Sequence, residues 1–239
     1  MFIDLFLRLL LAHVLSDFFL QNDAWCKQKL EKRFACWHCY AHAFIVFLLS
    51  WMALWTWSAW SFALCIAFLH WIIDCCKVKD GFWSFVIDQM AHLLCLICFA
   101  FMYENVWCGT MYSLPEDWNL ILLYVLVFLT NAKPANILTK HILKLYSVHN
   151  PQEENGDASD YAKFQSGALI GSIERWLIII FIFLNHYEAI GFLLAAKSII
   201  RFRDSDTTKT EYVLAGTLIS VFMAVVSALL FCALEKWWA

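Results

Sequence analysis

The first half of the chain carries four pairs of ionisable residues, and the members of every pair are four positions apart. Each pair falls in a different apolar segment, and the pairs are His13 and Asp17, His38 and His42, His70 and Asp74, and Asp88 and His92. On an α-helix this spacing places both side chains on one face, about 6 Å apart along the axis. Four such helices could present all eight groups to a common centre.

The chemistry of these groups is that of a metal site. Imidazole nitrogens and carboxylate oxygens are ligands of zinc, iron, manganese and nickel. We therefore expect the eight residues to hold one or two divalent transition metal ions, with zinc as the first candidate, and the remaining side chains to orient the ligands. A two-metal hydrolytic site is chemically feasible. Within it, Asp88 and His42 are our candidates for proton transfer.

Other interpretations of the four pairs are a proton or ion pathway and simple tethering of helices by hydrogen bonds. Ionisable groups are costly inside a membrane, and four pairs at one depth favour a metal or catalytic centre. The pair His38 and His42 lies beside a basic loop, so it could partly face water. That loop contains Lys27, Lys29, Lys32 and Arg33, which we interpret as determinants of membrane topology.

Cysteines form a second pattern. Cys36 and Cys39 bracket His38 in the sequence CWHC, which is similar to half of a zinc or redox motif. No second CxxC follows, and the adjacent Cys75 and Cys76 are expected to be geometrically poor partners. Most of the ten cysteines interrupt apolar runs, so we expect ordinary packing as small hydrophobic residues.

The composition identifies the elements that must position these residues. Hydrophobic residues make up 62% of the 239 positions and charged residues 15%, against roughly 45–50% and about 25% in an ordinary soluble domain. This excess excludes a soluble globular protein, because a single core cannot contain it. The net charge of −3 gives no indication of a nucleic-acid partner. The surrounding solvent is therefore a lipid bilayer.

Eight segments are apolar and long enough to cross a bilayer, if the seventh is not a re-entrant helix. We predict an all-α polytopic transmembrane bundle with its polar centre in the first four spans. The segments are approximately 2–20, 37–58, 59–76, 83–103, 118–133, 166–184, 187–200 and 211–235.

Lysine and arginine gather in alternate connections between these spans. By the positive-inside rule those connections are cytoplasmic, which places both termini on the outer side of the membrane and all four pairs near the cytoplasmic face. We divide the chain into two four-span halves, 1–110 and 111–239, and the second half contains a polar cytoplasmic loop at about 146–163.

The second half has charges predicted at the same depth. Arg175, Lys197 and Arg201 could hold the phosphate or carboxylate of a substrate above the metal centre. Alternatively, Lys197 and Arg201 extend to lipid headgroups while Glu174 and Glu211 neutralise them.

Several spaced motifs resemble a bacterial family of integral membrane proteins, catalogued as a domain of unknown function and often encoded beside SatD-type proteins. The resemblance covers mainly residues 1–100, and the second half is similar to the longer members. More loosely, the intramembrane His and Asp are similar to those of membrane-bound metal-dependent hydrolases. The motifs are HVLSDFFLQ at 13–21 with Trp25 and Lys29, HWIID with Lys77 at 70–77, and DQMAH at 88–92.

The leading functional hypothesis is a membrane-embedded hydrolase in which metal-bound water attacks a membrane lipid or lipid-linked phosphate. The alternatives are a divalent metal-ion transporter and an interaction subunit with a structural metal site. The outer halves of the second to fourth spans are almost entirely apolar, which favours a closed-ended pocket over a transport route.

Overall fold

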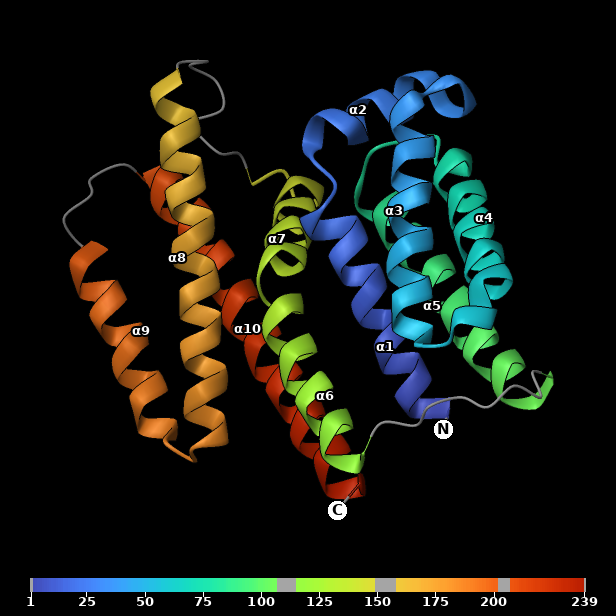
Figure 1. Cartoon of the computed structure of the whole chain (residues 1–239). Coiled ribbons are helices and arrows are strands. Elements are labelled where there is room, and N and C mark those ends of the chain that lie inside the picture. The colour runs from blue at the N-terminus through green and yellow to red at the C-terminus, as the bar shows by residue number, and fades with distance from the viewer. Residues whose placement is uncertain (1, 107–114, 149–157, 202–206, 239) are drawn as a thin grey trace. The chain divides into compact units, whose positions relative to one another are not determined.

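The computed structural model describes residues 2–106, 115–148, 158–201 and 207–238, and its regular elements within these ranges are helices (Figure 1). The chain divides into two compact units, Met1–Leu126 (unit 1) and Val127–Ala239 (unit 2). The predicted functional division near residue 110 stays a prediction. Residues 149–157 of the predicted loop at 146–163 lie outside the described residues, and its last part is helical instead, because a helix begins at Ala158.

Among the described residues, five helical segments are long and apolar enough to cross a membrane, which confirms the prediction of an all-α, multi-pass membrane protein. The number of spans and the side on which the termini lie stay predictions. The predicted spans at 2–20, 166–184 and 187–200 are largely helical but are not among the five, which are Trp37–Leu54, Trp57–Cys76, Phe82–Asn105, Trp118–Leu145 and Glu211–Lys236.

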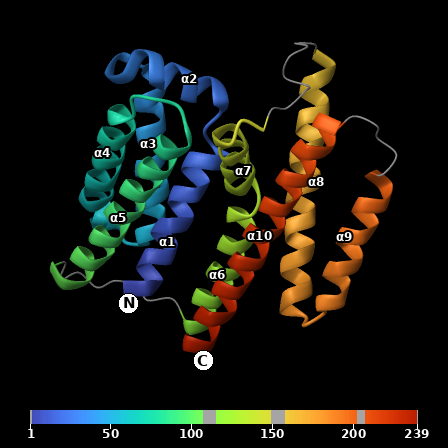
Figure 2. The same cartoon turned by 180° about the vertical axis from the view of Figure 1, so that it is seen from behind.

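Unit 1 contains a bundle in which α1 and α4 each pack against both α3 and α5, as the two opposite views show (Figures 1 and 2). One end of the bundle is filled by apolar side chains, which exclude water between the helices. The bundle helices are α1 (Phe2–Val14), α3 (Trp37–Leu54), α4 (Trp60–Cys76) and α5 (Phe82–Val106), and the apolar core includes Leu5, Leu9, Leu54, Ala63, Ile66, Leu96, Phe99 and Ala100.

The connections at the other end of the bundle shape its polar part. The helix α1 continues into a turn of π-helix, Leu15–Phe19, whose wider turn is closed by a 3.0 Å bond from the Leu20 N–H to the Leu15 carbonyl. Such π-turns are frequent at functional sites. The helix α2 (Asp23–Lys32) follows, with the Asn22 side chain accepting a hydrogen bond from the Trp25 N–H. It packs against α3 and α4.

Unit 2 is organised around α8 (Ala158–Phe183), which packs against α7 (Lys133–Leu145), α9 (Tyr187–Arg201) and α10 (Thr207–Trp238). The helix α6 (Glu116–Thr130) ends just before α7, and the carbonyls of Asn131 and Ala132 lie at the break between them. The buried Arg175 guanidinium donates to both, at 2.6 and 3.2 Å. It also donates to three side-chain oxygens, those of Asn136, Ser172 and Ser220.

Replacing Arg175 with methionine should lower the free energy of unfolding by about 2 kcal/mol, because buried oxygens then lose their donors. Denaturant titration of the detergent-solubilised protein, followed by tryptophan fluorescence, measures this. The control Lys236→Met removes an exposed cation from the same unit and should change stability by less than about 0.5 kcal/mol. Equal stability of the two variants would contradict the bridging role of Arg175.

Candidate metal centre

Seven of the eight predicted ligands lie together inside unit 1, and the His42 side chain is fully buried. They come from every helix of the bundle and from the π-helix. The helices α4 and α5 contribute two of these residues each. The seven residues are His13, Asp17, His42, His70, Asp74, Asp88 and His92.

The four-residue spacing brings the members of three pairs together, as the sequence predicts. His13 Nδ1 lies 3.6 Å from Asp17 Oδ1, His70 Nε2 lies 3.7 Å from Asp74 Oδ2, and His92 Nε2 lies 3.8 Å from Asp88 Oδ1. The rings of His70 and His92 stack with their centroids 4.0 Å apart, which joins α4 to α5. The spacing within each helix therefore brings the members of a pair together, and the packing of α4 against α5 brings two of the pairs together.

Contacts between helices create the tightest group of ligand atoms. Asp17 Oδ1 lies 3.4 Å from the Nε2 atoms of both His42 and His70, and these two nitrogens are 3.0 Å apart. Tetrahedral zinc with ligand bonds of 2.0–2.1 Å requires ligand atoms about 3.3 Å apart. The group formed by Asp17, His42 and His70 therefore fits a tetrahedral ion.

Three overlapping triads offer ligand atoms that all lie within 4.8 Å of one another. Two of them share no residue, so two ions could have separate sets of ligands. The third triad overlaps both, because it shares His70 with one of them and His92 with the other. The triads are Asp17, His42 and His70; Asp74, Asp88 and His92; and His13, His70 and His92.

The triad of Asp74, Asp88 and His92 contains two buried atoms that lack a hydrogen-bond partner among the described residues, Asp88 Oδ1 and His92 Nε2. Buried polar atoms in folded proteins nearly always have partners. A bound cation would accept the lone pair of each atom. The other Asp88 oxygen is already engaged, since Lys77 and Gln89 donate to it at 3.2 and 3.3 Å.

Two lysines reach the carboxylates of this triad. Lys77 pairs with Asp88, and the buried Lys29 of α2 donates to Asp74 Oδ2. Burial by itself would lower the pKa of Lys29, but the Asp74 carboxylate raises that pKa above its ordinary value. Lys29 therefore does more than set topology, which corrects the sequence interpretation. The available sequence signal for a role of Lys29 was its occurrence, four residues after Trp25, in the first of the family-like motifs.

The ammonium group of Lys29 competes with any cation for Asp74. Replacing Lys29 with methionine should therefore raise the affinity for Zn²⁺ about tenfold, a gain of about 1.4 kcal/mol. Competition titration against a zinc chelator measures the change. Lys27→Met is the matched control, because Lys27 is an exposed lysine of the same helix. Weaker binding by Lys29→Met than by this control would contradict competition.

The sequence profile of DUF3307, described as a protein of unknown function, matches residues 5–131. The match covers more than half of the chain and contains all seven clustered residues. The chain belongs to the DUF3307 family. No curated protein and no solved structure matches it. The expected resemblance to a family of unknown function is therefore confirmed.

The eighth predicted ligand, His38, also lies in the DUF3307 region but takes part in none of the described triads. It sits in the first turn of α3, where its Nδ1 lies 3.9 Å from the Cys36 sulfur and its ring is 5.1 Å from that of Trp25. His38 therefore lies one helical turn before His42, at the start of α3, and contacts the residues there.

The three predicted anion-binding residues belong to unit 2, outside the DUF3307 region. Arg175 gives its donors to the protein oxygens described above. Lys197 pairs with Glu174 at 2.5 Å, which agrees with the alternative interpretation of neutralised charges. The side chain of Arg201 lies outside the described residues. Their role in substrate binding stays a prediction.

Proposed function

We propose that this DUF3307 protein is a membrane-embedded, metal-dependent hydrolase that acts on a lipid or lipid-linked phosphate from the cytoplasmic leaflet. The observation that carries the proposal is the convergence of Asp17, His42 and His70 at distances of 3.0–3.4 Å. Zinc is the proposed ion, because these separations and the mixed nitrogen and oxygen donors suit its tetrahedral coordination.

Charge supports an anionic substrate. With neutral imidazoles, three carboxylates and the two ammonium groups of Lys29 and Lys77 leave one net negative charge in the cluster. One divalent ion makes that charge positive, and a second increases it further. Lys29 and Lys77, which stay paired with Asp74 and Asp88, would then offer their remaining N–H donors to a phosphate. We propose these two lysines of unit 1 as the anion-binding residues.

A bound divalent cation would polarise the substrate phosphate and lower the pKa of water. The chain's own contribution is to hold and move protons. Asp88 is the proposed base when a single ion is held by Asp17, His42 and His70, because its buried Oδ1 then has no partner among the described residues while Lys77 and Gln89 hold Oδ2 in place. His42 Nε2 belongs to the proposed ligand set with Asp17 and His70, so we assign His42 to metal binding, and its role in proton transfer stays a prediction.

A metal-ion transporter would use the same donor types but needs a polar route to the opposite face. The apolar core of unit 1, from Leu9 to Ala63 and Phe99, fills the other end of the same bundle. Asp4 and Arg8 are buried in that half and pair with each other on α1. This packing favours a site that is closed on one side.

Reconstituted vesicles separate the candidate functions. The hydrolase should release phosphate or a cleaved headgroup from phosphatidic acid or a polyprenyl diphosphate in vesicles, only when Zn²⁺ is present. Metal uptake into vesicles that depends on His13 and Asp17 would instead establish transport. If neither occurs and the bound metal does not exchange, the site is structural, and the hydrolase proposal is wrong.

A further inference from the structure

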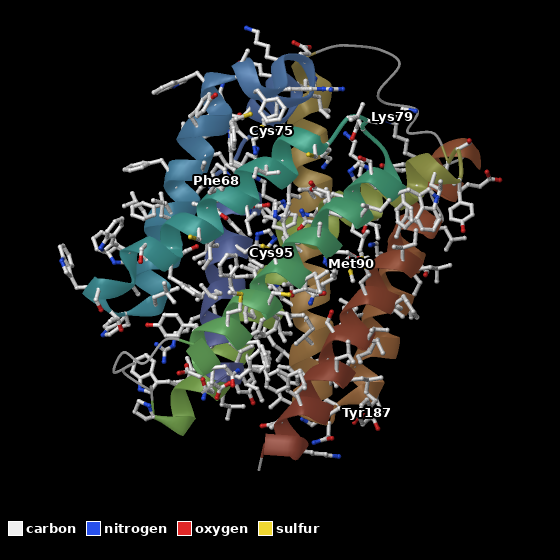
Figure 3. The ribbon with its side chains drawn as sticks, turned by 90° about the vertical axis from the view of Figure 1, so that its right-hand side faces the viewer. Phe68, Cys75, Lys79, Met90, Cys95 and Tyr187 are labelled. Atoms are coloured by element: carbon white, nitrogen blue, oxygen red, sulfur yellow. The ribbon has the colours of Figure 1, made fainter. Side chains whose placement is uncertain are left out.

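A second group of potential ligands lies beside the first, at the junction of α3 and α4. Cys36, Cys39 and Cys75 are each only 1–2% exposed and form one buried cluster with Trp71 packed against it. Cys75 lies in the last turn of α4, at the end near α2 (Figure 3). Cys75 therefore is a spatial partner of the CxxC sequence, which corrects the expectation drawn from the sequence.

The backbone at the start of α3 directs the two cysteines of CWHC toward one side. The Cys36 N–H donates to the Arg33 carbonyl and the Cys39 N–H donates to the Cys36 carbonyl, each at 3.0 Å. These bonds form consecutive tight turns, in which Arg33 has a left-handed φ of 45°. The close packing of α3 against α4 then brings Cys75 into the same buried cluster. These residues are not among the described groups whose ligand atoms all lie within 4.8 Å of one another, so a bound ion would have to draw the sulfurs closer together.

Two polar groups lie beside the cluster. His38 Nδ1 lies 3.9 Å from the Cys36 sulfur. The indole nitrogen of Trp71 is buried and has no hydrogen-bond partner among the described residues. Buried N–H groups without a partner are rare in folded proteins, and this one belongs to the side chain that packs against the thiol cluster.

We propose that Cys36, Cys39 and Cys75, with His38 as fourth ligand, form a second metal site that binds a thiophilic d¹⁰ cation, Zn²⁺ or Cu⁺. Three sulfurs and one imidazole are a common ligand set for structural zinc, and thiolates also select Cu⁺. Binding requires deprotonated sulfurs, so each ligated thiol releases its proton to solvent. The site would join the start of α3 to the end of α4 and shares no ligand with the His and Asp centre.

A disulfide between Cys36 and Cys39 is the competing use of the motif. The topology predicted from the sequence places this end of the bundle in the cytoplasm, where thiols are kept reduced. Reduced, buried and clustered thiols favour metal binding over a stable disulfide.

Cobalt substitution tests the proposal on the full-length protein in detergent. Reduced wild-type protein titrated with Co²⁺ should develop a sulfur-to-cobalt charge-transfer band in the near ultraviolet. Cys75→Ser should abolish most of the band and weaken Co²⁺ binding at this site more than about 100-fold. Cys76→Ser is the matched control, because Cys76 is the exposed neighbour of Cys75, and it should keep the band unchanged.

Asp17→Asn should keep the band as well, which separates the thiol site from the His and Asp centre. Displacement of Co²⁺ by Zn²⁺ or by Cu⁺ then identifies the preferred cation. If Cys75→Ser does not fold, Cys36→Ala provides the same readout. Three results would each overturn the proposal. They are a wild-type protein without the band, a band that Cys75→Ser and Cys36→Ala both retain, and a Cys36–Cys39 disulfide in protein from reducing cytoplasm.

Discussion

Replacing His70 with glutamine should lower the affinity for Zn²⁺ by more than about 100-fold. Loss of a residue that only orients a metal ligand costs up to about 100-fold, and loss of a ligand itself should cost more. His70 belongs to two of the three triads, so its loss leaves each with two ligands. Glutamine keeps a polar side chain in the buried position. Competition titration measures the change, in a Cys75→Ser background so that thiols do not contribute.

His186→Gln is the control for this experiment. His186 is an exposed histidine between α8 and α9 and is expected to have no effect on zinc affinity. If His70→Gln binds zinc as tightly as His186→Gln does, the cluster of imidazoles and carboxylates is held together by hydrogen bonds alone.

Replacing Asp88 with asparagine should lower kcat for phosphate release by about 100- to 10,000-fold, the range expected for loss of a general base. Asparagine has nearly the same shape but cannot accept the proton at Oδ1. Zinc bound by Asp17, His42 and His70 should remain, because Asp88 is not in that triad. Turnover and zinc content are measured on the same vesicle preparation.

The matched control is Asp80→Asn, which changes an exposed carboxylate in the connection between α4 and α5. It should keep wild-type turnover. Unchanged kcat in Asp88→Asn would remove Asp88 from the mechanism, whereas loss of all zinc from this variant would make Asp88 a required ligand and not the base.

Sequence spacing predicted much of the candidate centre, because helical geometry is local. The pairs at His70 and Asp74, and at Asp88 and His92, need only an α-helix to bring their members together. Composition likewise predicted membrane helices, since the excess of apolar residues is a property of the whole chain. Neither inference required knowledge of which helices are neighbours.

Tertiary contacts account for what the sequence did not predict. Whether His38 or Lys29 reaches the centre depends on where α3 begins and how α2 packs, and the four-residue spacing indicates neither. Cys75 joins Cys36 only because α3 packs against α4. The π-helix that carries Asp17 replaces the regular turn that a spacing argument assumes.

The central claim is that the seven His and Asp residues bind a metal ion, and elemental analysis of purified protein tests it most directly. Protein produced under metal-replete conditions with Cys75→Ser, which removes the thiol site, should contain at least one divalent transition metal ion per chain. Adding His70→Gln should remove that ion, whereas adding His186→Gln should not. Absence of bound metal in the first protein, or the same metal content in all three, would contradict the claim.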